Sequence, residues 1–443
     1  MKKYLALAFI FAVVVKAQCG EPGLAGGKHL SIDDVVNLAL QANLDVAVAE
    51  KQVEIIQSRY RQYLGMALPN VSVTGSYTRN IKKPSIILFG QKFETGENNG
   101  FDGAANVDQV VYSGGRVKTG IEAGRKMVSA EKNALQGMKN DIVFTAKRLF
   151  YSIMLASATA VIQKDNLALS VEHLDTIHER FKQGLDPDLT VRRQDVEVAD
   201  AKTTYIQALN LFEVAKLSMQ DLLTLDLDVP LELTGYFAEP SETMVPYEAV
   251  VKKALEARPE LQAAHTRVKI AADIVKLAAG DNKPQLSAFF TYRWTGQSSD
   301  FSPQENERDD SVAAGLRLRY SVFTGFDTYE QIKQYSIQQA QAKLAEEKMV
   351  RAVKLDVRSQ WLDISEALER VRAQGASIEQ ARLAMEATEK RYQAGQSSQL
   401  ELNDATFAFN RARTLHAQAL HDYWVSVAAL ERAAGAYLGD IKQ

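Results

Sequence analysis

Two stretches of the sequence, each containing a proline near its start, alternate apolar and polar side chains: residues 68–79 read LPNVSVTGSYTR, and residues 283–294 read KPQLSAFFTYRW. In the first stretch, Val71, Val73 and Tyr77 share one side, opposite serines and threonines. In the second, one side carries Leu286, Ala288, Phe290, Tyr292 and Trp294. A period of two is typical of a β-strand with one apolar face, so the sequence predicts strands at 71–79 and 286–294.

The two stretches belong to a tandem repeat. Residues 31–79 align without a gap onto residues 246–294 at an offset of 215, and residues 112–227 align onto 323–438 at an offset of 211. Because the offsets differ by four, the only length change falls between Asn80 and Val111, where a surface loop would tolerate it. We therefore expect a first structural repeat at 30–227, a linker at 228–244 and a second repeat at 245–440.

Each repeat has the same internal plan. Ser31 begins a predicted helix that runs to Leu68 with a break near Asn43, where the second copy has Pro259. A second strand is expected to return beside each first strand, at 103–113 and 311–323. The alternation is clearer in the strand at 311–323. There Arg317 and Arg319 lie on one face, and the other face is apolar: Val312, Ala314, Leu316, Leu318, Tyr320 and Val322.

Long helices follow each strand pair. About 68 residues run without proline up to Gly184, and again up to Gly395, which predicts helices of roughly 100 Å at 1.5 Å per residue. In the second run, apolar residues from Val350 to Ile378 alternate spacings of three and four, as in a coiled-coil seam. The two shorter helical segments of the first repeat, 44–68 and 188–224, placed end to end would match the length of one long helix.

Four amphipathic strands are too few to close a barrel, because even a small closed barrel needs about 8 strands. Several chains must therefore contribute. Apolar side chains on one face and Ser, Thr and Arg on the other fit lipid outside and water inside. A sheet packed on a soluble core produces the same alternation. Tyr292 and Trp294, expected near a strand end where an aromatic girdle would lie, favour the membrane barrel.

The N-terminus favours export from the cytoplasm. Lys2 and Lys3 precede an apolar run of about 12 residues, which is well short of the roughly 20 that span a bilayer. A small residue, Ala17, stands where a signal peptidase could cut, so residues 1–17 are predicted to be a signal peptide. Cys19 follows this cut, but Lys-Ala-Gln at 16–18 does not match the sequence that usually precedes an acylated cysteine, and lipidation is not favoured.

Composition excludes several classes of protein. The 443 residues hold 52 Lys and Arg against 55 Asp and Glu, a net charge of −3, which argues against a polybasic nucleic-acid binder. A single cysteine excludes an internal disulfide and metal sites built from several thiolates. The pairs His173/His178 and His416/His421 are each five residues apart, whereas zinc-binding pairs on a helix usually use four. We predict no catalytic, cofactor-binding or metal-binding residues.

Four short motifs, in this order and spacing, resemble those of the bacterial TolC-like outer-membrane efflux proteins. Two follow the strand pairs, at 111–115 and 322–325, and two end the long helices, at 180–184 and 391–395. The resemblance covers nearly all of residues 30–440. It implies a mainly α fold with a β-barrel portion: a homotrimer whose 12 strands form one outer-membrane barrel, continued by a periplasmic tunnel of coiled-coil helices.

The resemblance also implies a function. Such a protein passively conducts substrates as the outer-membrane channel of a tripartite efflux or type I secretion system, docked to a periplasmic adaptor and an inner-membrane pump or secretion ATPase. A soluble periplasmic coiled-coil scaffold or adaptor would share the long helices. Heat-resistant, detergent-dependent trimers in the outer-membrane fraction would favour the channel, and a soluble monomer would favour the scaffold.

By the same resemblance, the periplasmic entrance narrows at Glu401 and Asp404, just after the second tip glycine. Gly184 and Gly395 match the tip turns and the region of adaptor docking. The family's tip arginine corresponds to Ser397, and its acidic partner corresponds to Thr190, so that closing link should be absent here.

A different closing link is available in the first repeat. The offset of 211 places Thr190 and Arg193 at the positions equivalent to Glu401 and Asp404. We predict a lock in which Arg192 or Arg193 pairs with one of these acids, within or between chains. Apolar packing around Tyr392 is the alternative means of closure.

Overall fold

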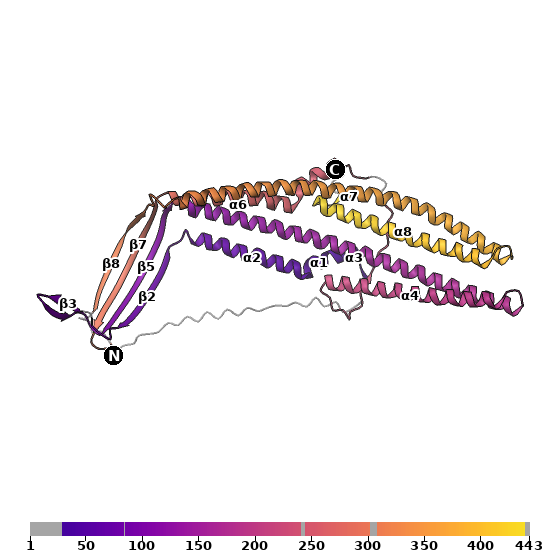
Figure 1. The fold of residues 1–443 in the computed structure, drawn as a ribbon, viewed down its shortest axis with the longest axis horizontal. Coiled ribbons are helices and arrows are strands. Elements are labelled where there is room, and N and C mark those ends of the chain that lie inside the picture. The colour runs from indigo at the N-terminus through magenta and orange to yellow at the C-terminus, as the bar shows by residue number, and fades with distance from the viewer. Residues whose placement is uncertain (1–28, 84, 241–243, 302–307, 439–443) are drawn as a thin grey trace.

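The computed structural model describes residues 29–83, 85–240, 244–301 and 308–438. The molecule is elongated, with a sheet at one end and a long shaft of helices that extends away from it (Figure 1). The predicted signal peptide at 1–17 and Cys19 lie outside the described residues.

Two helices of 67 residues each, α3 (Arg116–Lys182) and α7 (Asp327–Gln393), run the length of the shaft. Their length confirms the prediction made from the proline-free runs. Shorter helices lie along each of them, two per repeat (Figure 1): α2 (Leu44–Gly65) and α4 (Asp188–Leu222) along α3, and α6 (Pro259–Ala279) and α8 (Gln399–Ala434) along α7. Two short helices therefore do match one long helix in each repeat.

Side-chain caps mark the starts of α1 and α2. Ser31 caps α1 (Ile32–Ala42): its Oγ accepts a hydrogen bond from the Asp34 N–H, and the Asp34 carboxylate accepts one from the Ser31 N–H. Asn43 ends α1 and caps α2 through its Oδ1, which accepts from the Asp45 N–H at 2.9 Å. Its Nδ2 also donates to the Leu222 carbonyl at the end of α4, 3.0 Å away. Asn43 therefore links the start of α2 to the end of α4.

The second repeat makes the same break with a proline. Helix α5 (Tyr247–Ala257) ends before Arg258, and Pro259 is the first residue of α6. A proline suits this position because the N–H it lacks would have no partner inside the helix.

Four strands form one antiparallel sheet in the order β2-β5-β7-β8. The strands are β2 (Asn70–Arg79), β5 (Asn99–Ser113), β7 (Gln285–Ser298) and β8 (Arg308–Arg319). Directly opposed residues share a face, and one such row is apolar: Val73, Ala105, Tyr292 and Val312. The next row, on the other face, is mostly polar: Ser72, Asn106, Thr291 and Ala313. The predicted strand faces are therefore present.

Two details of the sheet differ from the prediction. Strand β8 ends at Arg319 rather than at 323, because its partner β7 begins at Gln285, opposite Arg319, and the preceding Pro284 has no N–H to continue the ladder. Tyr292 and Trp294 do not lie near a strand end, because β7 continues to Ser298.

The aromatic cluster at the outer end of the sheet comes from other residues. Tyr77 packs against Phe101 and Phe301, with ring centroids 5.2 and 5.4 Å away. Beyond this cluster, β3 (Ser85–Leu88) and β4 (Gln91–Glu94) form a small separate hairpin.

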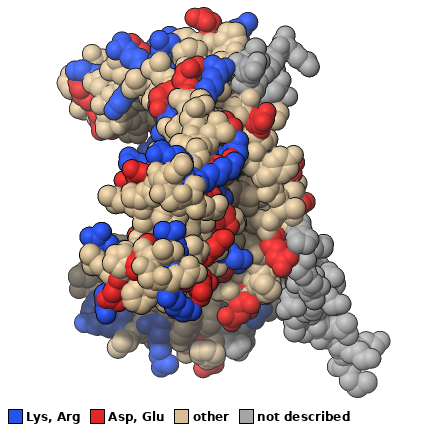
Figure 2. All heavy atoms as spheres, turned by 90° about the vertical axis from the view of Figure 1, so that its right-hand side faces the viewer, with Lys and Arg blue, Asp and Glu red and all other residues tan. Residues whose placement is uncertain are grey.

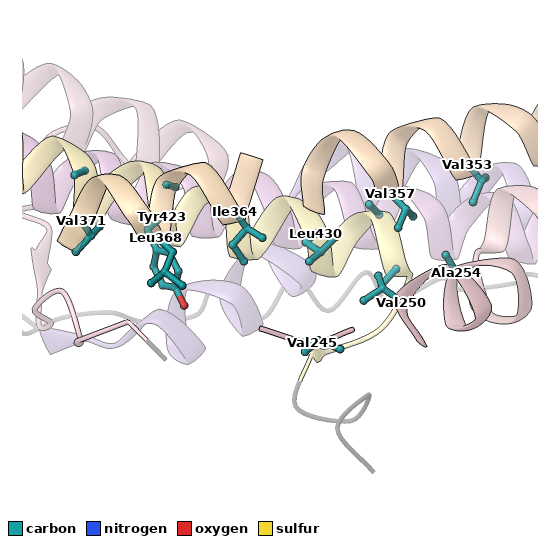
Figure 3. Close-up of a cluster of buried hydrophobic side chains, with 14 residues drawn as sticks. Val245, Val250, Ala254, Val353, Val357, Ile364, Leu368, Val371, Tyr423 and Leu430 are labelled. Carbon is teal, nitrogen blue, oxygen red and sulfur yellow. The ribbon is translucent and has the colours of Figure 1, made fainter. Parts of the chain in front are cut away.

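Each repeat has its own hydrophobic core in the middle of the shaft. In the second repeat, α5 contributes Val250 and Ala254, while Tyr423 and Leu430 come from α8 (Figure 3). Helix α7 contributes members of the predicted seam: Val353, Val357, Ile364, Leu368 and Val371. The first repeat builds an equivalent cluster from Val35 and Ala39 of α1, Phe150 and Ile153 of α3, and Met219 of α4.

The chain between the repeats is tied to the second helix pair. The indole Nε1 of Trp361 on α7 donates to the Val245 carbonyl at 3.1 Å, and that of Trp424 on α8 donates to the Ala238 carbonyl at 3.0 Å. A short parallel pair, β1 (His29–Leu30) and β6 (Glu232–Leu233), joins the start of the described chain to the same region. Across the described ranges, none of the helices combines the length and apolar character needed to cross a bilayer.

Candidate functional site: the helical tips

The two tips lie at the end of the shaft farthest from the sheet (Figure 1). Gly184 and Gly395 have φ angles of +74° and +71°, a left-handed conformation that side chains disfavour. Each glycine N–H donates to the carbonyl three residues earlier, at 2.9 Å, in Phe181 and Tyr392. The N–H groups of the following residues, Leu185 and Gln396, donate to the carbonyls of Arg180 and Arg391. Both long helices therefore end in the same glycine-dependent turn.

Seen from this end, the molecule presents acidic and basic side chains side by side rather than a surface of one sign (Figure 2).

Glu401 and Asp404 lie at the start of α8, and both are exposed in the single chain. The N-cap residue Ser398 accepts a hydrogen bond from the Glu401 N–H at 3.3 Å, and the Ser397 hydroxyl donates to the Glu401 carboxylate. The bond from Ser397 lowers the pKa of Glu401 below its usual value. Carboxylates are also favoured here by the positive end of the helix dipole.

Arg192 and Arg193 do not meet these acids within the chain. Arg192 Nε donates to Asp188 Oδ2 at 2.7 Å, one turn earlier on α4, and Arg193 is exposed. In the described part of the chain, no ion pair joins either arginine to Glu401 or Asp404. The within-chain form of the predicted lock is absent there, and the form between chains stays a prediction.

Tyr392 instead contacts a different arginine of the first tip. The Arg180 guanidinium carbon lies 5.6 Å from the centre of the Tyr392 ring, and Arg180 Nε donates to Asp186 Oδ2 at 2.8 Å. Burial, together with the nearby Asp186, raises the pKa of the Tyr392 phenol, which therefore stays neutral. This contact joins the two tips. Arg180 was part of the tip motif, but sequence spacing alone gave no sign of its partner.

A second link between the hairpins lies just above the tips. Gln399 Nε2 on α8 donates to Gln194 Oε1 on α4 at 2.8 Å, and Gln194 Nε2 donates to the Ser170 carbonyl on α3 at 2.9 Å. Farther along, Asn410 Nδ2 donates to Asn166 Oδ1 at 2.6 Å. None of these residues could be singled out from the sequence, because isolated Gln and Asn residues on long polar helices form no motif with a recognisable spacing.

These bonds border a polar cleft of about 400 Å³ between α3, α4 and α8. The Thr406 hydroxyl on its wall is buried without a hydrogen-bond partner, and burial lowers the pKa of the His173 imidazole on the same wall. Near the tips the two hairpins therefore meet in part through amides and this cleft. Such an interface costs less to separate than the cores at mid-shaft.

His416 and His421 have ordinary packing roles. His421 lies 3.3 Å from the Ser152 hydroxyl and 2.9 Å from Asp422, and burial lowers the pKa of His416. Over the described ranges, no group of three or more His, Cys, Asp or Glu side chains is arranged to hold a metal ion.

Comparison with known proteins decides the family. The sequence model described as "Outer membrane efflux protein" matches this chain twice, at residues 35–224 and 250–436, once in each repeat. The chain belongs to the outer membrane efflux protein family. It is an outer-membrane channel of the TolC type with a periplasmic helical extension, and not an enzyme.

Two curated members illustrate the relationship. The chain is 24% identical over 322 residues to the outer membrane protein TolC of Vibrio cholerae serotype O1, covering 69% of this chain and 72% of that protein. It is 23% identical over 397 residues to the outer membrane efflux protein BepC of Brucella suis biovar 1, covering 89% of this chain and 81% of that protein.

Solved structures of the family share the fold. The Campylobacter jejuni CmeC outer membrane channel superimposes with a TM-score of 0.78 at 16% identity, covering 91% of this chain and 85% of CmeC. The arrangement of four strands and paired long helices is therefore the efflux-channel fold.

Proposed function

We propose that three copies of this chain assemble into one continuous duct, with a 12-stranded barrel in the outer membrane and a helical tunnel in the periplasm. The observation that carries this proposal is the sheet itself. Its four strands leave β2 and β8 each with a single neighbour, and its apolar face is exposed in the single chain. Exposed strand edges pair readily with other strands, and closing the barrel removes them.

The polar face of the sheet would then line the pore. It carries cross-strand ion pairs, such as Arg293 to Asp102 at 2.7 Å, and hydrogen bonds, such as Thr291 Oγ1 to Asn106 Oδ1 at 3.0 Å. The opposite face carries Phe290, Tyr292 and Leu318, which would contact lipid. Water inside and lipid outside satisfy both faces.

At the periplasmic end, three copies of Glu401 and Asp404 would form the narrowest part of the duct. The position of both exposed acids at the start of α8 supports this proposal, because a ring of carboxylates attracts cations. The tip turns at Gly184 and Gly395 would dock a periplasmic adaptor. The adaptor would connect the duct to an inner-membrane pump or secretion ATPase, which supplies the energy that a passive channel lacks.

The test is the state of the protein in detergent. Analytical ultracentrifugation should give a single trimeric species, and planar bilayers should show discrete conductance steps. A stable, folded monomer with intact β content would contradict the proposal and favour the soluble scaffold. Crosslinking in cells followed by purification would identify the adaptor and the pump.

A further inference from the structure

The internal repeat relates one strand contact inside the chain to the contact between copies. The offset of 215 carries β2 onto β7. The offset of 211 carries β5 onto β8, because the opposed pair Asn70 and Asp108 then becomes the opposed pair Gln285 and Arg319. Inside the chain, the second strand of the first repeat, β5, pairs with the first strand of the second repeat, β7. The equivalent contact at the free edges joins β8 of one copy to β2 of the next.

The same relationship gives the register of that contact. Gln109 on β5 lies opposite Ala288 on β7. Adding 211 to 109 gives Tyr320, and subtracting 215 from 288 gives Val73. The neighbouring pairs of residues Ala105–Tyr292 and Asn106–Thr291 become Leu316–Tyr77 and Arg317–Ser76 in the same way.

Each derived pair joins residues from matching faces. Tyr320 and Leu316 continue the apolar face of β8, while Val73 and Tyr77 lie on the apolar face of β2. Arg317 and Ser76 both lie on the polar face. A slip of one residue would place every apolar side chain opposite a polar one, so the face pattern independently supports this register.

The register also accounts for the early end of β8. Strand β5 loses its partner β2 after Asp108, yet it continues to Ser113 because β7 pairs with the remainder. Strand β8 loses its partner β7 after Arg319 and has no second neighbour in the single chain. The residues equivalent to 109–113 are 320–324, which are described outside any strand.

Several of these residues and their derived partners are apolar and exposed. Val73 is 80% exposed, Tyr320 is 53% exposed and Phe323 is 74% exposed in the single chain. Pairing would supply backbone hydrogen bonds to 320–324 and leave these three apolar side chains on the face that contacts lipid.

We infer that a second copy of this chain pairs its β2 with β8 in this register, with Tyr320 beside Val73 of the neighbouring copy, and that β8 then extends to Thr324. This inference rests on the proposed barrel of several chains and adds the register of its seams.

Disulfide crosslinking of the full chain tests the register. In the double variant Val73→Cys with Tyr320→Cys, oxidation should link neighbouring copies into a covalent trimer on a denaturing gel. A bond within one chain is excluded, because β2 and β8 are three strand spacings apart, about 14 Å, and a disulfide needs Cα atoms within about 7 Å. The matched control is Val73→Cys with Leu316→Cys, which lies four residues out of register and should stay monomeric on the gel.

The outcomes separate the register from the assembly. The single-cysteine parents, which retain Cys19, give the baseline for unrelated bonds. Crosslinking of the control pair, or of neither pair in a protein that sediments as a trimer, would overturn the register while leaving the trimer intact. A monomer in the ultracentrifuge would instead overturn the proposed function. A second pair on the polar face, Ser76→Cys with Arg317→Cys, must give the same result as the first.

Discussion

Gln399, the first residue of α8, donates a 2.8 Å hydrogen bond to Gln194 of α4. Gln194 is only 1% exposed, and its own amide nitrogen donates to the Ser170 carbonyl of α3. The buried amide of Gln194 therefore connects helices of both hairpins. Its partner Gln399 lies two residues before Glu401. This link and the contact between Arg180 and Tyr392 both join the tips in the single chain.

Removing the amide bridge should loosen the entrance. The change Gln399→Ala leaves a buried acceptor on Gln194 unsatisfied, which costs about 1–3 kcal/mol. We expect faster amide hydrogen exchange at the start of α8 and a higher resting conductance in planar bilayers. The exposed Gln183→Ala serves as the control. Unchanged exchange and conductance in Gln399→Ala would mean that the bridge does not hold the tips.

Charges on the apolar face of the sheet should impair membrane assembly. Arginine in place of Phe290, Tyr292 or Leu318 would face lipid, at a cost of about 2–4 kcal/mol near the bilayer midplane. Heat-resistant trimer in the outer-membrane fraction should decrease for all three variants. Thr291→Arg, one residue away on the polar face, should assemble normally. Normal assembly of these three variants together with impaired assembly of Thr291→Arg would show that the two faces have been assigned the wrong way round, and equal assembly of all four would contradict the lipid-facing assignment.

The acidic pair at the start of α8 should make the channel cation-selective. Three copies of Glu401 and Asp404 around a narrow axis would concentrate negative potential where little water remains. The double change Glu401→Ala with Asp404→Ala should shift the single-channel reversal potential in a salt gradient toward zero. Glu213→Ala, an exposed acid farther along α4, is the control. A reversal potential unaffected by the double change would leave these acids as part of a solvated helix surface.

The predicted lock between copies can be tested with the two arginines of α4. An exposed ion pair contributes only about 0–1 kcal/mol, so closure would need three copies with partial burial. Arg192→Ala with Arg193→Ala should raise resting conductance and antibiotic entry, while Lys182→Ala should not. Equal conductance of the double variant and the parent protein would eliminate the lock and leave closure to Tyr392 and its neighbours.

Acid should destabilise the tip region through two histidines. Burial lowers the pKa of His173, with Glu389 and Glu172 partly opposing it, and burial also lowers the pKa of His416. Below the ordinary histidine pKa of about 6.5, the unfolded chain binds more protons than the folded chain. The stability conferred by the neutral imidazoles is therefore present at pH 7.5 and is lost as the pH falls through this value.

Hydrogen exchange of α3 and α8 at pH 7.5 and 5.5 measures this effect. The double variant His173→Gln with His416→Gln should show a smaller increase in exchange on acidification than the parent protein. The control His178→Gln, at an exposed position on α3 near His173, should behave like the parent protein. A full acid response in the double variant would assign it to other groups.

The sequence was sufficient for the long helices, the four strands of the main sheet and their repetition, but it gave no sign of the hairpin formed by β3 and β4. Strand faces follow from a period of two, and the long helices follow from runs without proline, because these signals are local along the chain. The turns at the tips could also be predicted from the sequence, since a left-handed residue at the end of a helix is usually glycine. The error at Tyr292 and Trp294 arose because the alternation of β7 weakens before its true end at Ser298.

Contacts between the repeats could not be read from the sequence. The partners of Tyr392 and Gln399 are Arg180 and Gln194, each about 200 residues earlier, and which side chains meet depends on how two hairpins cross. The predicted partner Arg192 is held by Asp188 on its own helix instead. Local periodicity determined which helices and strands form and which faces are apolar. Only the tertiary structure decided which polar groups meet between them, because that choice depends on the packing angle and depth of helices far apart in the sequence.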